Sequence, residues 1–136
     1  MKRYIVAATM VLSLVSCGEA QTKKDSNGTS SVEQISETNY KVVSQTEFKT
    51  LIKAGKGQLL DVRTPSEFNA GHIKAAENID FTGSDFREKV AKLDREKPVL
   101  IYCHSGNRSG KASLILKELG FKEVYDLQGG YSNWNE

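Results

Sequence analysis

Residues 98–102 read Pro-Val-Leu-Ile-Tyr, an apolar run that leads directly into the polar hexapeptide Cys-His-Ser-Gly-Asn-Arg at 103–108. Beyond it, an apolar stripe recurs at helical spacing, made up of Ala112, Ile115, Leu116 and Leu119. Gly120 then stands where a left-handed helix C-cap is expected, with Phe121 behind it. The order predicts a short buried strand, a tight polar loop and an amphipathic helix.

Cys103 stands at the carboxyl end of this expected strand. The residues after it form a polar loop, which consists of His104, Ser105, Gly106, Asn107, Arg108 and Ser109. Such a loop can turn backbone N–H groups toward the sulfur, and the N-terminus of the following helix points the same way. Both effects favour an anion, so we expect a thiolate nucleophile. A buried structural cysteine is the alternative, but a core cysteine needs no polar loop after it.

The N-terminus has the pattern of an export signal. Lys2 and Arg3 precede the uncharged, largely apolar run 5–15, which is too short to span a bilayer as a helix. The sequence Leu-Val-Ser-Cys at 14–17 resembles the lipobox of bacterial lipoproteins. The resemblance implies a signal peptide at 1–16, cleavage before Cys17 and acyl chains that anchor the protein to a membrane of the cell envelope, facing the periplasm or the cell surface. The alternative is an ordinary signal peptide followed by a chance cysteine.

A polar, Ser/Thr-rich segment follows, and residues 17–39 are expected to form a lipidated cysteine and a flexible tether. The folded domain is expected over 40–136. The chain has 19 Lys and Arg against 17 Asp and Glu, with no basic stripe, so the sequence gives no support to nucleic-acid binding. Its two cysteines are Cys17 and Cys103, and lipid on the first would leave the second without a disulfide partner.

Strand-like and helix-like segments alternate through the domain. Segments expected as strands lie at 40–43, 58–62, 75–79, 99–102 and 123–127. Capping signals or apolar periodicity predict helices after Ser44, after Thr64, over 85–93 and after the cysteine loop, with a last helical piece ending at Trp134. The alternation predicts an α/β domain in which helices cover both faces of a parallel sheet. Ligands then bind beyond the carboxyl ends of the strands, where Asp61 and Cys103 both stand.

Five motifs then occur in a fixed order along the chain. They are 61–68 (Asp-Val-Arg-Thr-Pro-Ser-Glu-Phe), 71–73 (Gly-His-Ile), 76–79 (Ala-Glu-Asn-Ile), the Cys103 loop, and Gly129-Gly130 with Trp134. In this set and order, residues 40–136 resemble a single-domain rhodanese. The resemblance implies a central five-stranded parallel sheet flanked by helices, and a sulfurtransferase activity with Cys103 as its nucleophile.

The implied chemistry is a double displacement. Cys103 would take a sulfur atom from thiosulfate or a persulfide, hold it as a cysteine persulfide, and pass it to a thiol or to cyanide. The N–H groups of 104–109 would stabilise the persulfide anion, and no metal or organic cofactor is expected. The alternative is a persulfide carrier or thiol-redox module that docks on another exported protein and has little activity on thiosulfate.

Loop length separates this chemistry from phosphate-ester hydrolysis. Four residues lie between Cys103 and Arg108, whereas the related tyrosine phosphatases have one more, which widens the loop enough for a phosphate. Arg108 has two expected roles, holding an anionic donor or tying down the loop. His104 is expected to be an exposed loop side chain, because sulfur transfer from a thiolate needs no general base. The alternative is that His104 donates a proton or modulates the Cys103 pKa.

Three further expectations concern residues that support the fold. Asp61 and Arg63 are expected to form an ion pair that supports the active loop or the fold around it. His72 is expected to be a hydrogen-bonded structural histidine. Trp134 is expected to lie in the core.

Overall fold

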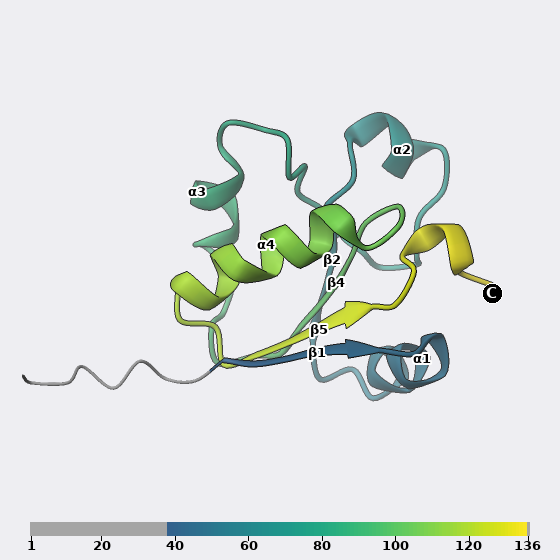
Figure 1. Cartoon of the computed structure of the whole chain (residues 1–136), viewed down its shortest axis with the longest axis horizontal. Coiled ribbons are helices and arrows are strands. Elements are labelled where there is room, and N and C mark those ends of the chain that lie inside the picture. Colours follow the sequence, from purple (N-terminus) through teal and green to yellow (C-terminus); the bar gives the residue numbers. More distant parts are fainter. Residues whose placement is uncertain (1–37, 136) are drawn as a thin grey trace, which may run out of the picture. The chain divides into compact units, whose positions relative to one another are not determined.

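The computed structural model describes residues 38–135, which contain one five-stranded sheet. Its strands are β1 Asn39–Val43, β2 Gln58–Asp61, β3 Glu77–Asn78, β4 Val99–Tyr102 and β5 Glu123–Leu127. They are ordered β1-β5-β4-β2-β3, and every neighbouring pair runs parallel (Figure 1). The predicted five-stranded parallel sheet is therefore confirmed.

Helices cover both faces of this sheet. They are α1 Gln45–Lys53, α2 Pro65–Asn69, α3 Phe86–Val90 and α4 Asn107–Glu118, followed by the 3₁₀ turn η1 Tyr131–Asn133. One apolar cluster joins α3 and α4 to the sheet, and a second joins α1 and η1 to its opposite face. Figure 1 shows α4 running along the sheet, with α1 at its other side.

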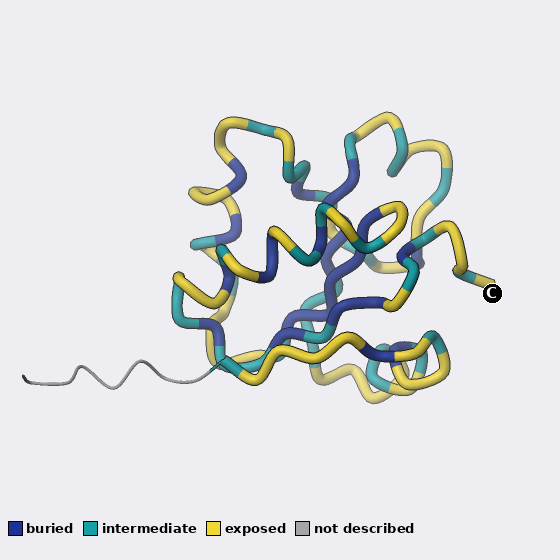
Figure 2. Tube along the Cα trace, in the orientation of Figure 1, coloured by how far each residue is buried: buried dark blue, intermediate teal, exposed yellow. Residues whose placement is uncertain are grey.

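Strand β4 occupies the middle of the sheet, and all four of its residues are buried. Val99 and Ile101 contact the α4 cluster, whereas Leu100 and Tyr102 contact the α1 cluster, as the two-residue period of a strand requires. Cys103 continues the alternation and joins the α4 cluster. The edge strand β1 is exposed over most of its length, in contrast to this buried centre (Figure 2).

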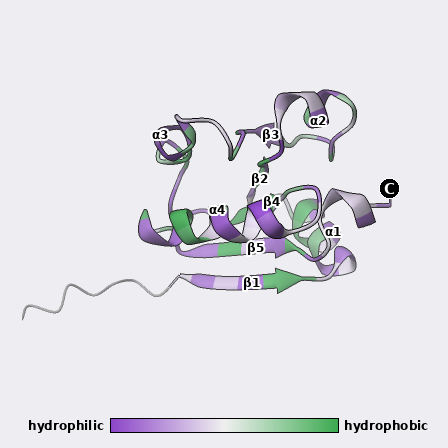
Figure 3. Ribbon diagram, turned by 45° about the horizontal axis from the view of Figure 1, so that its top comes forward, coloured by the Kyte–Doolittle hydropathy of each residue, from purple (hydrophilic) through white to green (hydrophobic). Residues whose placement is uncertain are grey.

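Local signals set several helix ends. The Thr64 side chain and Glu67 form a complete capping box at the start of α2, with Pro65 as the first helical residue. At the end of α4, Phe121 N–H donates to Leu116 O at 3.1 Å and Gly120 N–H donates to Lys117 O at 3.0 Å. This is a Schellman motif, and Gly120 adopts the left-handed conformation it needs, with φ 84°. Figure 3 shows α4 alternating between hydrophobic and hydrophilic residues, as a helix with one face on the sheet should.

Several predicted boundaries and the predicted burial of Trp134 were wrong. The strand expected at 75–79 is only Glu77–Asn78, because Ala75 has φ 69° and cannot extend a strand. The helix expected over 85–93 ends at Val90, and the next bonds, such as Leu93 N–H to Val90 O at 3.1 Å, span three residues rather than four. Helix α4 begins at Asn107, so the second half of the expected loop is helical. Trp134 is half-buried at the rim of the α1 cluster rather than inside the core.

The expected signal peptide, the lipid-bearing Cys17 and most of the expected tether lie outside the described residues. Within residues 38–135, no helix is both long enough and apolar enough to cross a bilayer.

Candidate active site

The Cys103 sulfur lies at the junction between β4 and α4. The residue is 1% exposed and is not part of a disulfide. Its Sγ accepts a hydrogen bond from the Gly106 N–H at 3.0 Å and one from the Ser109 hydroxyl at 3.5 Å. The loop therefore wraps the sulfur as its sequence predicts.

Gly106 makes this wrapping possible. It has φ 99°, a conformation that favours glycine, and it is the residue at which the loop turns into α4. The turn directs the N–H groups of Ser105 and Gly106, and that of Ser109 in the first turn of α4, at the sulfur. A 12-residue helix thus starts just after the Cys103 loop turns.

The pKa of the Cys103 thiol reflects two opposing effects. Burial raises it, but the hydrogen bond from the Ser109 hydroxyl and those from the N–H groups of Ser109, Ser105 and Gly106 lower it more. The net result is a pKa below the ordinary value of a cysteine thiol. A larger share of Cys103 is consequently present as the reactive thiolate near neutral pH.

The segment 130–132, after β5, is hydrogen-bonded to the backbone of the Cys103 loop. Tyr131 N–H donates to the Cys103 carbonyl at 2.8 Å, and Ser132 N–H donates to the His104 carbonyl at 2.9 Å. Gly130 precedes them, and a Cβ there would lie 2.6 Å from the carbonyl oxygens of both loop residues. Only a glycine permits this close approach.

Arg108 ties the loop to α2. Its Nη1 and Nη2 donate to the two carboxylate oxygens of Glu67, both at 2.7 Å. The hydrogen bonds from the Arg108 guanidinium lower the Glu67 pKa to about 2. Burial acts in the opposite direction, and hydrogen bonds from Thr64 add to the lowering. Of the two expected roles of Arg108, the structure shows the tie that holds the loop.

Asp61 and Arg63 form the expected ion pair, with Arg63 Nη2 2.6 Å from Asp61 Oδ2 and side chains 3% and 0% exposed. Arg63 also donates to the Gly71 carbonyl at 2.7 Å. Its guanidinium carbon lies 4.0 Å from the centre of the Tyr131 ring. Tyr131 in turn donates its backbone N–H to the Cys103 carbonyl. The Asp61–Arg63 ion pair is therefore connected to the loop through Tyr131.

The remaining predicted loop residues lie toward solvent. His104, Ser105 and Asn107 are exposed, and the known contacts of the first two with the site are made by their backbone groups. His72 is hydrogen-bonded, as expected: its Nδ1 lies 3.0 Å from the Phe68 carbonyl, and its ring stacks on Phe68 at 3.7 Å.

Three supporting residues were missed in the sequence: Glu67, Gly130 and Tyr131. Glu67 was assigned only to its capping box, because nothing local shows that it meets Arg108, 41 positions away. The Gly129-Gly130 pair was recognised as a motif in the sequence. It was the one local signal that the backbone there passes close to another segment. Within residues 38–135 there is no group of three or more His, Cys, Asp or Glu side chains that could hold a metal ion.

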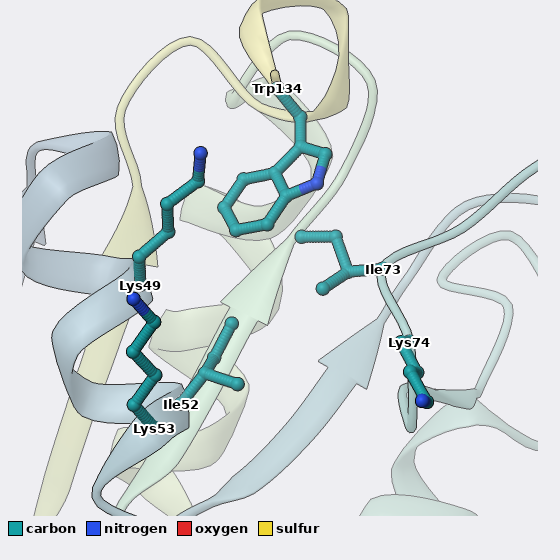
Figure 4. A pocket seen from close by; sticks show the side chains of 6 residues that line it. All are labelled: Lys49, Ile52, Lys53, Ile73, Lys74 and Trp134. Carbon is teal, nitrogen blue, oxygen red and sulfur yellow. The ribbon is translucent and has the colours of Figure 1, made fainter. Parts of the chain in front are cut away.

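A cleft of about 390 Å³ lies on the α1 face. Ile52, Ile73 and Trp134 provide its apolar surface, and Lys49, Lys53 and Lys74 also line it (Figure 4). Trp134 is linked to the loop through η1, since the backbone N–H of Trp134 donates to the Tyr131 carbonyl at 3.0 Å. The cleft is thus apolar inside and positively charged around its edge.

Residues 44–136 match the family model of the rhodanese-like domain. The chain belongs to the rhodanese family. Among relatives, this rhodanese is 38% identical over 94 residues to the uncharacterized protein YqhL of Bacillus subtilis, covering 69% of this chain and 71% of that protein. It is 31% identical to the thiosulfate sulfurtransferase GlpE of Shewanella oneidensis, covering 73% and 96% of the two chains. The GlpE of Coxiella burnetii is 38% identical, with 70% of this chain and 87% of that protein covered.

Solved structures agree with this assignment. A rhodanese-related protein from Thermoplasma volcanium superposes with a TM-score of 0.62 at 35% identity, covering 70% of this rhodanese and 90% of that chain. A human single-domain sulfurtransferase gives a TM-score of 0.59 at 26% identity, covering 68% and 93%. The α/β architecture is therefore that of single-domain rhodaneses.

Proposed function

We propose that this rhodanese transfers sulfane sulfur through a persulfide on Cys103. In the first half-reaction, the thiolate attacks the outer sulfur of thiosulfate or of a persulfide. A new S–S bond forms on Cys103 while the donor S–S bond breaks, and its electron pair leaves with sulfite or with the donor thiolate. The relatives that are named thiosulfate sulfurtransferases support this choice of donor.

In the second half-reaction, a thiolate or cyanide attacks the outer sulfur of the Cys103 persulfide. The acceptor gains that sulfur, and the electron pair of the broken bond returns to Cys103 as thiolate. The observation that carries the proposal is the ring of donors around Sγ, with the Gly106 N–H at 3.0 Å and the Ser109 hydroxyl at 3.5 Å. These donors stabilise the Cys103 thiolate, which is the attacking group in the first half-reaction and the leaving group in the second.

The intact mass of the purified protein tests this proposal. Incubation with thiosulfate should add one sulfur atom, cyanide should remove it, and Cys103→Ser should prevent the addition while the protein stays folded. A sulfur adduct that persists in Cys103→Ser would overturn the assignment of the nucleophile. Loading by a persulfidated protein but not by thiosulfate would instead identify a persulfide carrier.

The lysine-lined cleft is the feature that favours a carrier as second candidate. Apolar side chains framed by three lysines suit a partner protein that presents an apolar residue among acidic ones. In that case sulfur would arrive from, or leave to, a partner protein and not a small molecule.

We also propose that the protein is exported and anchored by lipid on Cys17, which rests on the sequence pattern at 1–17. The expected result of Cys17→Ala is a protein that loses acylation and leaves the lipid-anchored membrane fraction. Acyl-group labelling followed by fractionation measures both, and unchanged acylation in the variant would contradict the anchor.

A further inference from the structure

Asp126 is a buried carboxyl group that the proposed reaction leaves unused. It lies in β5 and is 3% exposed. Its Oδ2 accepts from the Tyr40 hydroxyl at 3.3 Å, whereas its Oδ1 is buried without a hydrogen-bond partner among the described residues. The first turn of α4 lies against it, since a Cβ on Gly110 would be 4.0 Å from Oδ2.

Its surroundings differ from those of Asp61, the other buried acid within residues 38–135, which is paired with Arg63. The elements around Asp126 present Tyr40 from β1 and Ser109 from α4, while β4 presents Ile101 in register. Burial raises the Asp126 pKa to about 6, and the Ser109 and Tyr40 hydroxyls offset part of that rise. Asp126 thus changes its charge close to neutral pH.

Ser109 stands between this carboxyl group and the nucleophile. Its hydroxyl lies 3.5 Å from Cys103 Sγ and 3.2 Å from the Gly106 carbonyl, and it also lowers the pKa of Asp126. A serine hydroxyl has one hydrogen to donate but can accept two hydrogen bonds. The thiolate, an ionised Asp126 and the Gly106 carbonyl therefore compete for the same hydrogen.

We propose that Asp126 is a positioning residue that controls Cys103 through Ser109. When Asp126 is protonated, its own O–H can donate to Ser109 Oγ, which leaves the hydroxyl hydrogen for the sulfur. When Asp126 is ionised, it draws that hydrogen away and adds a negative charge near the thiolate. The inference deepens the proposed function, because it assigns a regulator to the same nucleophile.

The direction of the effect follows from this competition. Ionisation of Asp126 removes a donor from the thiolate, so it raises the Cys103 pKa. Asp126→Asn should imitate the protonated carboxyl, because its amide donates at every pH and carries no charge. Above the Asp126 pKa of about 6 and below the thiol pKa, we expect Cys103 in this variant to be alkylated faster by about threefold to tenfold, the factor for a shift of about half to one pKa unit.

The test is the rate of Cys103 alkylation by iodoacetamide between pH 5 and 10, followed on the Cys103 peptide so that Cys17 does not contribute. The profile of the native sequence should show an inflection near the Asp126 pKa of about 6 below the main thiol titration, and Asp126→Asn should lack it. Arg108, its partner Glu67 and His104, the other charged or titratable side chains in or bonded to the loop, are unchanged in these variants. Identical profiles would overturn the proposal.

Two further variants isolate the route. In a Ser109→Ala background, Asp126→Asn should have no additional effect on the profile, and a full effect there would overturn the relay through Ser109. Tyr40→Phe removes a hydroxyl that favours the ionised carboxyl, so it should move the lower inflection to higher pH. Because Tyr40 is 43% exposed, this variant tests the idea even if Asp126→Asn does not fold.

Alkylation requires no sulfur donor, so its result is independent of the proposed sulfur transfer. A normal alkylation profile with no persulfide formation would overturn only the proposed function. Persulfide formation with no effect of Asp126→Asn on the profile would overturn only the role of Asp126.

Discussion

At the level of single residues, Gly130 is the position where backbone conformation and crowding act together. Its φ of 63° and ψ of −161° belong to a region that glycine alone adopts readily. A Cβ would also collide with the Cys103 and His104 carbonyls at 2.6 Å. Gly120 provides a matched comparison, because its φ is 84° but no other atom lies within 4 Å of an added Cβ.

We expect Gly130→Ala to cost about 3 kcal/mol or more in the free energy of unfolding, because conformational strain and collision add. Gly120→Ala should cost only about 1 kcal/mol, from the left-handed conformation. Urea unfolding measures both values. Gly130→Ala should also slow Cys103 alkylation, which Gly120→Ala should not; equal costs for the two variants would refute this account of the loop support.

At the level of elements, the Arg108–Glu67 pair joins the first turn of α4 to α2 across the active loop. The side chains are 25% and 32% exposed, and their contact is bidentate. The pair Arg87–Glu118 is a useful contrast, because a single hydrogen bond joins the two side chains, which are 54% and 61% exposed. Partial burial and geometry should make the first pair the stronger one.

Glu67→Gln should therefore lower stability at pH 7 by about 1 kcal/mol after allowance for solvent screening, whereas Glu118→Gln should change little. The Glu67 pKa falls on folding from 4.5 to about 2. The stabilisation is then fully present above pH 4.5 and is lost as the pH falls toward 2. Denaturant unfolding across this range should show a smaller pH dependence in Glu67→Gln; an unchanged pH dependence would contradict the assignment.

At the level of the whole molecule, Asp61 and Arg63 connect the centre of the sheet to the segments around it. Asp61 is the last residue of β2. Arg63 donates to the Gly71 carbonyl after α2, and its guanidinium also packs on the rings of Tyr102 and Tyr131. Because both charges are buried, each depends on the other for its solvation.

Removing one member should therefore be costly. We expect Arg63→Gln to lose about 3–5 kcal/mol of unfolding free energy, because Asp61 keeps a buried charge without its partner. The double variant with Asp61→Asn should recover part of that loss. Lys97→Gln, which breaks an exposed pair with Asp94, is the control and should stay within about 0.5 kcal/mol. Circular dichroism during guanidinium unfolding gives all values, and an additive double variant would exclude coupling between the two charges.

Features that depend on neighbours along the chain were readable from the sequence. The apolar run 98–102, the alternation of strands and helices, the capping box at Thr64 and the glycine end of α4 all follow from local spacing and backbone preference. The short elements were less readable. Strand β3 is cut short after the left-handed Ala75, and α3 gives way to three-residue hydrogen bonds after Val90, neither of which the local apolar pattern indicates.

By itself, the sequence determined the parallel sheet and the place of Cys103, because a buried strand followed by a glycine-containing loop and a helix fixes where that residue stands. Only the tertiary structure decided what surrounds it. Strand order places β5 beside β4, and this brings Asp126 against the first turn of α4 and the 130–132 segment against the loop carbonyls. It likewise brings Glu67 to Arg108. These contacts join residues far apart in the chain, so sheet order and packing create them, and local sequence cannot.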